Sequence, residues 1–103
     1  MRLGRAAGRR EVKIEEDLVA DVVMYKTKVC PFCVMAGMLL KKKGVPWREV
    51  DVTHDVELRK DMEKRSGRRT VPQIFIGDVS VGGYDDLARL ERAGELDLLL
   101  GLT

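Results

Sequence analysis

The sequence predicts an α/β domain built on a four-stranded mixed sheet with flanking helices, in the order β-α-β-α-β-β-α. Short apolar runs typical of strands alternate with longer amphipathic segments typical of helices. Glycine and proline stand at the boundaries between these segments. The chain has 103 residues, which is the size of one domain.

The N-terminal end differs from the rest of the chain in charge. Residues 1–10 contain four arginines and no acid, whereas the whole chain has 19 basic and 17 acidic side chains. The remainder is therefore slightly acidic, and its charge does not favour nucleic-acid binding. No apolar run is long enough for a membrane span. We expect residues 1–17 to form a disordered or loosely ordered basic extension and residues 18–103 to form the domain.

The first half of the domain reads as strand, helix, strand. Residues 20–25 hold an unbroken apolar run, which predicts a strand buried on both faces. Pro31 suits the first turn of a helix, which we expect to end before Gly44 and to pack deeply because most of its sides are apolar. Its last residues, Lys41–Lys43, are expected to form a solvated helix end. Residues 46–53 alternate in polarity and predict a second strand.

The second half contains a helix, a hairpin and further helical turns. The charged helix is expected to use Val56, Leu58 and Met62 as its apolar contacts. A two-residue Gly77-Asp78 turn joins two antiparallel strands. The predicted bounds are 55–66 for the charged helix, 72–76 and 79–81 for the two strands, 84–93 for the helix after them and 95–100 for the last helical turns.

Cys30 and Cys33 form one C-x-x-C motif at the start of the first helix. This motif after the first strand, with two α/β halves around one sheet, indicates a thioredoxin-like fold. Cys30 falls at the N-cap, where backbone N–H groups and the helix dipole favour thiolate over thiol. Cys33 lies one turn further on, and we expect it to resolve a mixed disulfide formed at Cys30.

Two other interpretations of the cysteine pair are weaker. A structural zinc ion needs four ligands, and His54 is the only other strong ligand, so no metal is expected. A pair of inert buried cysteines would not explain Pro31 between them at a helix start. The expected compartment is a reducing cytosol, where a close cysteine pair is more often chemical than structural.

Three motifs together resemble the dithiol glutaredoxins, most closely the small bacterial ones. They are Cys30-Pro31-Phe32-Cys33, Thr70-Val71-Pro72 and Gly82-Gly83-Tyr84-Asp85-Asp86. The resemblance covers about residues 20–102. It implies a cytoplasmic, monomeric thiol–disulfide oxidoreductase with glutathione as co-substrate and no metal. Its partners would be glutathione and disulfide-containing or glutathionylated proteins, with no nucleic acid and no membrane.

The resemblance also implies a glutathione site. The Val71 N–H and C=O groups would pair with the cysteine of glutathione like an added strand, beside a cis Val71–Pro72 bond. Amides at Asp85 and Asp86 would receive the γ-glutamyl carboxylate, and the Asp86 carboxylate would hold the ammonium. The implied glutathione-binding residues are Lys28, Phe32, Arg59, Thr70, Val71, Pro72, Gly83, Tyr84, Asp85 and Asp86.

One position departs from the family pattern. Glutaredoxins usually place a lysine three residues before the nucleophilic cysteine, where it meets the glycyl carboxylate, but this chain has Thr27 there. Lys28, Arg59 and Arg69 are the candidate replacements. We favour Arg59, because a guanidinium group can hold a carboxylate through two parallel hydrogen bonds.

Two other functions stay open at this point. The first is an iron–sulfur carrier, in which a dimer holds a cluster through Cys30 and glutathione; Pro31 disfavours the helix-end geometry that this requires. The second is a thioredoxin-like electron donor, which would leave the segment Gly82–Asp86 without a role.

Overall fold

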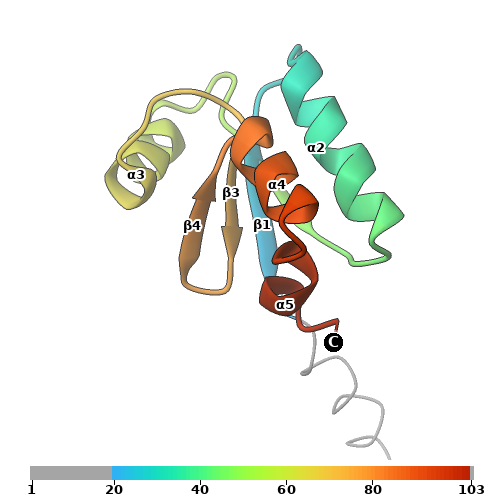
Figure 1. Ribbon diagram of the computed structural model, residues 1–103. Coiled ribbons are helices and arrows are strands. Elements are labelled where there is room, and N and C mark those ends of the chain that lie inside the picture. Colours follow the sequence, from blue (N-terminus) through green and yellow to red (C-terminus); the bar gives the residue numbers. More distant parts are fainter. Residues whose placement is uncertain (1–19, 103) are drawn as a thin grey trace, which may run out of the picture.

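The computed structural model describes residues 20–102, and Figure 1 shows their arrangement. The predicted extension at residues 1–17 and its boundary with the domain lie outside the described residues. The elements are β1 (Val22–Lys26), α2 (Pro31–Lys42), β2 (Arg48–Asp51), α3 (Val56–Ser66), β3 (Gln73–Ile76), β4 (Val79–Gly82), α4 (Tyr84–Arg92) and α5 (Leu96–Leu100).

The strands form one mixed sheet in the order β2-β1-β3-β4. β1 pairs in parallel with β2 and antiparallel with β3, and β3 pairs antiparallel with β4. The connection through α2 therefore makes a parallel crossover, and the Gly77-Asp78 turn closes a hairpin. The predicted α/β class, the mixed four-stranded sheet and the thioredoxin-like plan are all confirmed.

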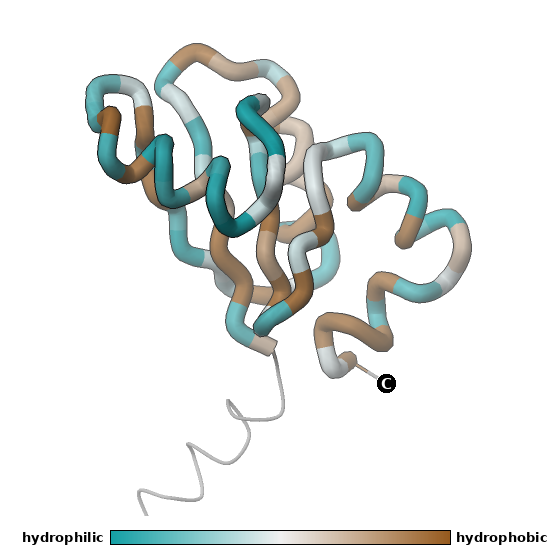
Figure 2. The backbone as a smooth tube through the Cα atoms, turned by 90° about the vertical axis from the view of Figure 1, so that its left-hand side faces the viewer, coloured by the Kyte–Doolittle hydropathy of each residue, from teal (hydrophilic) through white to brown (hydrophobic). Residues whose placement is uncertain are grey.

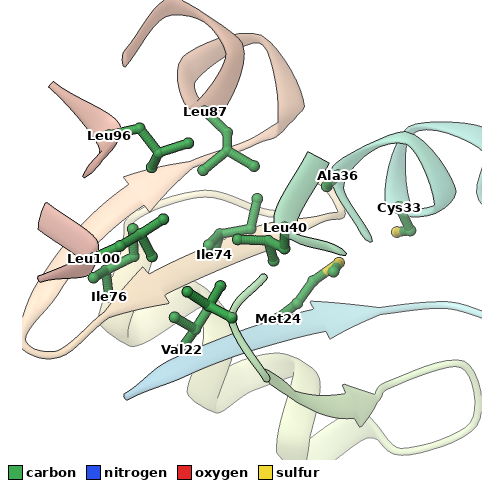
Figure 3. Packing of buried hydrophobic residues seen from close by; sticks show 11 residues of the cluster. Val22, Met24, Cys33, Ala36, Leu40, Ile74, Ile76, Leu87, Leu96 and Leu100 are labelled. Carbon is green, nitrogen blue, oxygen red and sulfur yellow. The ribbon is translucent and has the colours of Figure 1, made fainter. Parts of the chain in front are cut away.

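The sheet lies between two unequal helical layers (Figure 1). Because side chains alternate along a strand, Val22 and Met24 of β1 enter one core cluster while Val23 and Tyr25 enter the other. The larger cluster packs against α2, α4 and α5, and Figure 3 shows their leucines around the strand residues. Hydrophobic segments accordingly run through the middle of the molecule (Figure 2). No helix within residues 20–102 has the length and apolar character that crossing a membrane requires.

The expectation that α2 packs deeply on most sides is wrong. Its buried residues are Cys33, Ala36 and Leu40, which recur at helical spacing and make a single buried face. Val34 and Met38 lie on the opposite side and are 62% and 66% exposed. The reason is geometric: α2 covers one face of the sheet from outside, so only one side of the helix contacts the core.

The predicted contacts of α3 are corrected in the same way. Met62 is fully buried against the sheet, but Val56 is 66% exposed and Leu58 is also exposed. The ends of the helix follow the prediction, since Asp55 accepts a hydrogen bond from the Leu58 N–H (3.0 Å) and Gly67 adopts the left-handed conformation (φ 76°). Met62 is the one apolar side chain of α3 that is buried in the core, and polar side chains make its other contacts with the sheet, since Asp61 and Arg65 both hydrogen-bond to the Tyr25 hydroxyl.

Lys43 is not part of a solvated helix end. Its side chain is 15% exposed, and Nζ lies 2.7 Å from Glu91 Oε1 and 2.9 Å from Asp97 Oδ1. The hydrogen bonds that the ammonium donates, with the one to Glu91 contributing most and the one to Asp97 next, raise the pKa of Lys43. The ammonium therefore ties the end of α2 to α4 and to α5.

We predict that Lys43→Ala lowers the midpoint of urea denaturation at neutral pH, whereas Lys42→Ala, an exposed neighbour on the same turn, leaves it nearly unchanged. Because the pKa of Lys43 is raised in the folded state, its contribution to the free energy of unfolding is complete below the unfolded pKa of about 10.4. It is lost as the pH rises through the higher folded value. The difference between the two variants should therefore shrink in strong alkali. Equal midpoints at neutral pH would contradict this role.

Candidate active site

Three loops meet at one edge of the sheet. The register pairs Tyr25 with Gln73 and Ile74 with Gly82, so β1 ends, β3 begins and β4 ends at the same level. The chain segments just beyond these points carry the three motifs singled out in the sequence: 30–33 after β1, 70–72 before β3 and 83–86 after β4. Sheet topology alone therefore brings them together.

The first loop delivers Cys30 to the N-cap of α2. Its backbone is extended there (φ −154°, ψ 96°), and Pro31 occupies the first helical turn, as predicted. The Cys33 N–H donates a hydrogen bond to Cys30 Sγ (3.1 Å). The two cysteines are disulfide-bonded, with Cα atoms 5.2 Å apart. Cys33 is 5% exposed whereas Cys30 is only half-buried, so Cys30 is the more accessible sulfur.

The second loop faces that sulfur with its backbone. Cys30 Sγ lies 3.9 Å from the carbonyl oxygen of Val71, and the Val71–Pro72 peptide bond is cis. The fully buried Gln73 supports the loop, because its Nε2 donates to the carbonyl oxygen (3.0 Å) and to the hydroxyl (3.2 Å) of Thr70. Gln73 was not singled out in the sequence, although it is an amide at the start of an otherwise apolar strand.

An open pocket lies between these loops and α4. Phe32 and Tyr84 stack along it, with ring centroids 6.4 Å apart and an interplanar angle of 23°. Eight of the ten residues that the family resemblance implied for glutathione line this pocket, and Arg68 joins them. The lining residues are Phe32, Arg68, Thr70, Val71, Pro72, Gly83, Tyr84, Asp85 and Asp86.

Asp86 is the most strongly held charge in the pocket. Its Oδ2 accepts hydrogen bonds from the Gly83 N–H (2.9 Å) and from Arg68 Nη1 (2.8 Å), and Arg89 Nη2 donates to Oδ1 (3.2 Å). These contacts hold the pKa of Asp86 below its usual value, and the hydrogen bond from the Gly83 N–H contributes more than the guanidinium groups of Arg68 and Arg89. Gly82 permits this arrangement, because it has φ 110° and because a Cβ there would overlap the Asp86 carboxylate.

The cations proposed for the glycyl carboxylate lie outside the residues lining this pocket. Lys28 Nζ is 3.1 Å from Asp51 Oδ2. Arg59 Nη2 donates to the carbonyl oxygen of Arg69 (3.2 Å), and Arg69 itself is largely exposed. Each of these side chains thus has a protein partner elsewhere, namely Asp51 for Lys28, the Arg69 carbonyl for Arg59 and Glu63 for Arg69, and their roles toward a ligand stay predictions.

Arg68 is a charged pocket residue outside the set that the family resemblance implies. Its neighbour Arg69, which directly precedes the Thr70-Val71-Pro72 motif, is largely exposed and does not line the pocket. Arg68 is distinguished by its contact with Asp86, which lies 18 positions further along the chain, and a partner at that distance leaves no local signal in the sequence.

Comparisons with known proteins agree on one family. The family model described as Glutaredoxin matches residues 22–81. A glutaredoxin of Pseudomonas aeruginosa is 51% identical over 79 residues, which are 77% of this chain and 94% of that protein. The solution structure of glutaredoxin from Brucella melitensis is 50% identical, covers 82% of this chain and 91% of its own, and superposes with a TM-score of 0.73. The buckwheat glutaredoxin–glutathione complex has the same fold at 23% identity, with a TM-score of 0.72 over 89% of this chain and 88% of that one.

The Asp86 network predicts a pH-dependent loss of stability. Asp86→Asn should lower the free energy of unfolding at neutral pH by about 1 kcal/mol, because the helix cap loses its charge. A lowered folded pKa means that this contribution is present above the unfolded value of about 3.9 and is lost as the pH falls through the folded value. Denaturation curves of both proteins should therefore converge in acid. A difference that persists unchanged at pH ~2 would contradict this origin.

Proposed function

This chain belongs to the glutaredoxin family of thiol oxidoreductases, and we propose that it uses glutathione to reduce protein disulfides and glutathione mixed disulfides. One observation carries the proposal: the accessible sulfur of Cys30 lies at a helix N-terminus, next to the Val71 backbone and the pocket that contains Asp86. A buckwheat glutaredoxin of the same fold has been solved in complex with glutathione, which supports the choice of ligand.

In the proposed reaction, the Cys30 thiolate attacks the glutathione sulfur of a mixed disulfide. The old S–S bond breaks, the protein thiolate leaves and takes up a proton, and a Cys30–glutathione disulfide forms. The thiolate of a second glutathione then attacks the bound glutathione sulfur, which gives glutathione disulfide and regenerates Cys30. With a protein disulfide as substrate, the Cys30 thiolate attacks one of its sulfurs, and the first protein thiolate leaves. The Cys33 thiolate then attacks Cys30 Sγ, the second protein thiolate leaves, and the Cys30–Cys33 disulfide forms. Two molecules of glutathione reduce this disulfide to the dithiol and become glutathione disulfide.

The helix end is the source of the Cys30 reactivity in this proposal. The unpaired N–H groups and the dipole of α2 favour a negative charge at its N-terminus. The Cys33 N–H, which is 3.1 Å from Cys30 Sγ, would donate to the thiolate in the reduced protein. Lys28 is already paired with Asp51, whose pKa is held well below its usual range by the Thr53 hydroxyl and N–H and by Lys28 itself. Lys28 would therefore add little.

The pocket would hold glutathione by its backbone and its charges. The cysteine of glutathione would pair with the N–H and C=O of Val71, and the first-turn amides of α4 would receive the γ-glutamyl carboxylate. Asp86 would take the ammonium, and Phe32 and Tyr84 would flank the chain. Thr70, Pro72, Gly83 and Asp85 complete the lining.

The proposal also includes the working state of the protein. The domain would be residues 18–103, acting as a monomer in the cytoplasm, where thiols are kept reduced. Its macromolecular partners would be glutathionylated or disulfide-containing proteins. No bound metal has a part in the proposed reaction.

The two cysteines give the direct test. Cys30→Ser should abolish glutathione-coupled reduction of a small glutathione mixed disulfide. Cys33→Ser should retain this reaction, which needs one thiol, and should lose reduction of a protein disulfide. Steady-state rates with glutathione and glutathione reductase measure both reactions.

The same assay separates this proposal from the two alternatives. If Cys30→Ser and Cys33→Ser lost reduction of the glutathione mixed disulfide to the same extent, the mechanism that needs only the Cys30 thiol would be contradicted. Turnover with thioredoxin reductase but not with glutathione would indicate a thioredoxin-like donor. A coloured protein after purification, with absorbance at about 320–420 nm, would indicate a bound iron–sulfur cluster.

A separate prediction concerns the glycyl carboxylate. If Arg59 swings from the Arg69 carbonyl to this carboxylate, Arg59→Ala should raise the KM for glutathione about tenfold, as expected for loss of a charge-assisted hydrogen bond. Lys28→Ala should have a smaller effect, because Lys28 already has a partner in Asp51. If Arg59→Ala left the KM for glutathione unchanged and Thr27→Lys did not lower it, the glycyl carboxylate would be hydrated and would have no cationic partner in the protein.

A further inference from the structure

We propose that Arg68 determines specificity by binding the α-carboxylate of the γ-glutamyl group together with the first-turn amides of α4, so that Arg68 and Asp86 recognise both charges of that end. The inference rests on the proposed function and makes it narrower. It assigns to the pocket a preference for ligands that end in a free α-amino acid group, over ligands that carry only the amine or only the carboxylate.

The position of Arg68 suits this role. It lines the pocket, and its Nη1 lies 2.8 Å from Asp86 Oδ2. Its side chain is 51% exposed, compared with 19% for Asp86. A guanidinium group carries five N–H donors in one plane, so donors remain after the bond to Asp86 is made. The exposed part of the group is therefore available to a second anion.

The covalent structure of the ligand explains why that anion would be the α-carboxylate. The ammonium and the carboxylate of the γ-glutamyl group are attached to the same carbon atom. If Asp86 holds the ammonium, the carboxylate must lie within one carbon's reach of Asp86, and Arg68 is in direct contact with Asp86. The glycyl carboxylate is at the other end of glutathione, beyond the cysteine that would pair with Val71.

The backbone holds Arg68 in place before a ligand arrives. Gly67 ends α3 in the left-handed conformation (φ 76°), and the Arg68 N–H donates to Ser66 Oγ (3.0 Å). At the other end of the side chain, a Cβ on Gly82 would come within 3.0 Å of Arg68 Nη1. The guanidinium thus occupies space that only glycine leaves open. Such preorganisation reduces the entropic cost of binding.

The competing interpretation is that Arg68 is a counterion of Asp86 and has to give way to the ammonium of the ligand. The two interpretations predict opposite signs when Arg68 is removed: binding weakens if Arg68 contacts the carboxylate and strengthens if it competes with the ammonium. Arg89 supplies the matched control. It also donates to Asp86 (3.2 Å), but it does not line the pocket.

The experiment measures kcat/KM for removal of three groups from one peptide thiol by wild type, Arg68→Gln and Arg89→Gln. The groups are glutathione, its glutaryl analogue without the amine, and its γ-aminobutyryl analogue without the α-carboxylate. Arg68→Gln should lose tenfold or more with glutathione and with the glutaryl analogue, and less than twofold with the γ-aminobutyryl analogue. Arg89→Gln should lose less than threefold with all three. Arg68→Lys should recover part of the lost rate.

Equal losses of Arg68→Gln with all three groups would overturn the inference, since they would indicate a general structural role. A gain with glutathione would overturn it in favour of the counterion interpretation. Failure of the proposed function has a different signature, because wild type itself would then fail to turn over the glutathionylated peptide. Denaturation curves of Arg68→Gln and Arg89→Gln show whether both variants are folded.

Discussion

The antiparallel pairing of β3 with both β1 and β4 is the constraint on which the candidate site depends. Because β3 runs against its two neighbours, the ends of β1 and β4 and the start of β3 lie at one edge of the sheet. Cys30, Val71 and Asp86 come from sequence positions far apart, yet this register places their loops side by side. The helices make use of that edge, since α2 and α4 both begin there and direct their N-terminal N–H groups toward it.

The absence of a side chain at Gly82 is as important for the shape of the pocket as the charges of Arg68 and Asp86. The segment leaves β4 with a positive φ and brings Asp86 back onto the N–H of Gly83, and Arg68 closes on the same carboxylate. The pocket is thus prearranged as an anion and a cation in contact, beside a backbone edge at Val71. A zwitterionic peptide with a central thiol complements this arrangement, and the proposed function follows from that match together with the accessible sulfur of Cys30.

The sequence predicted the fold and most of the site, because strand alternation, Pro31 at a helix start and the glycine breaks are local signals. It also placed Cys30 at the N-cap correctly. It misjudged α2, since exposed Val34 and Met38 look like core residues until the single buried face of the helix is known. Lys43 and Arg68 were missed for a related reason: their partners, Glu91 and Asp86, are distant in sequence and come close only in the folded chain.

The central claim, that one pocket at this sheet edge holds glutathione against Cys30, is tested most directly by amide NMR shifts. The Cys33→Ser variant is converted to its Cys30–glutathione disulfide and compared with the reduced protein. Beyond the immediate neighbours of Cys30, the shifts should be largest at residues 68–71 and 83–86, with small changes at the distant residues 41–45. Shifts confined to the immediate neighbours of Cys30, with 83–86 unchanged, would contradict the claim.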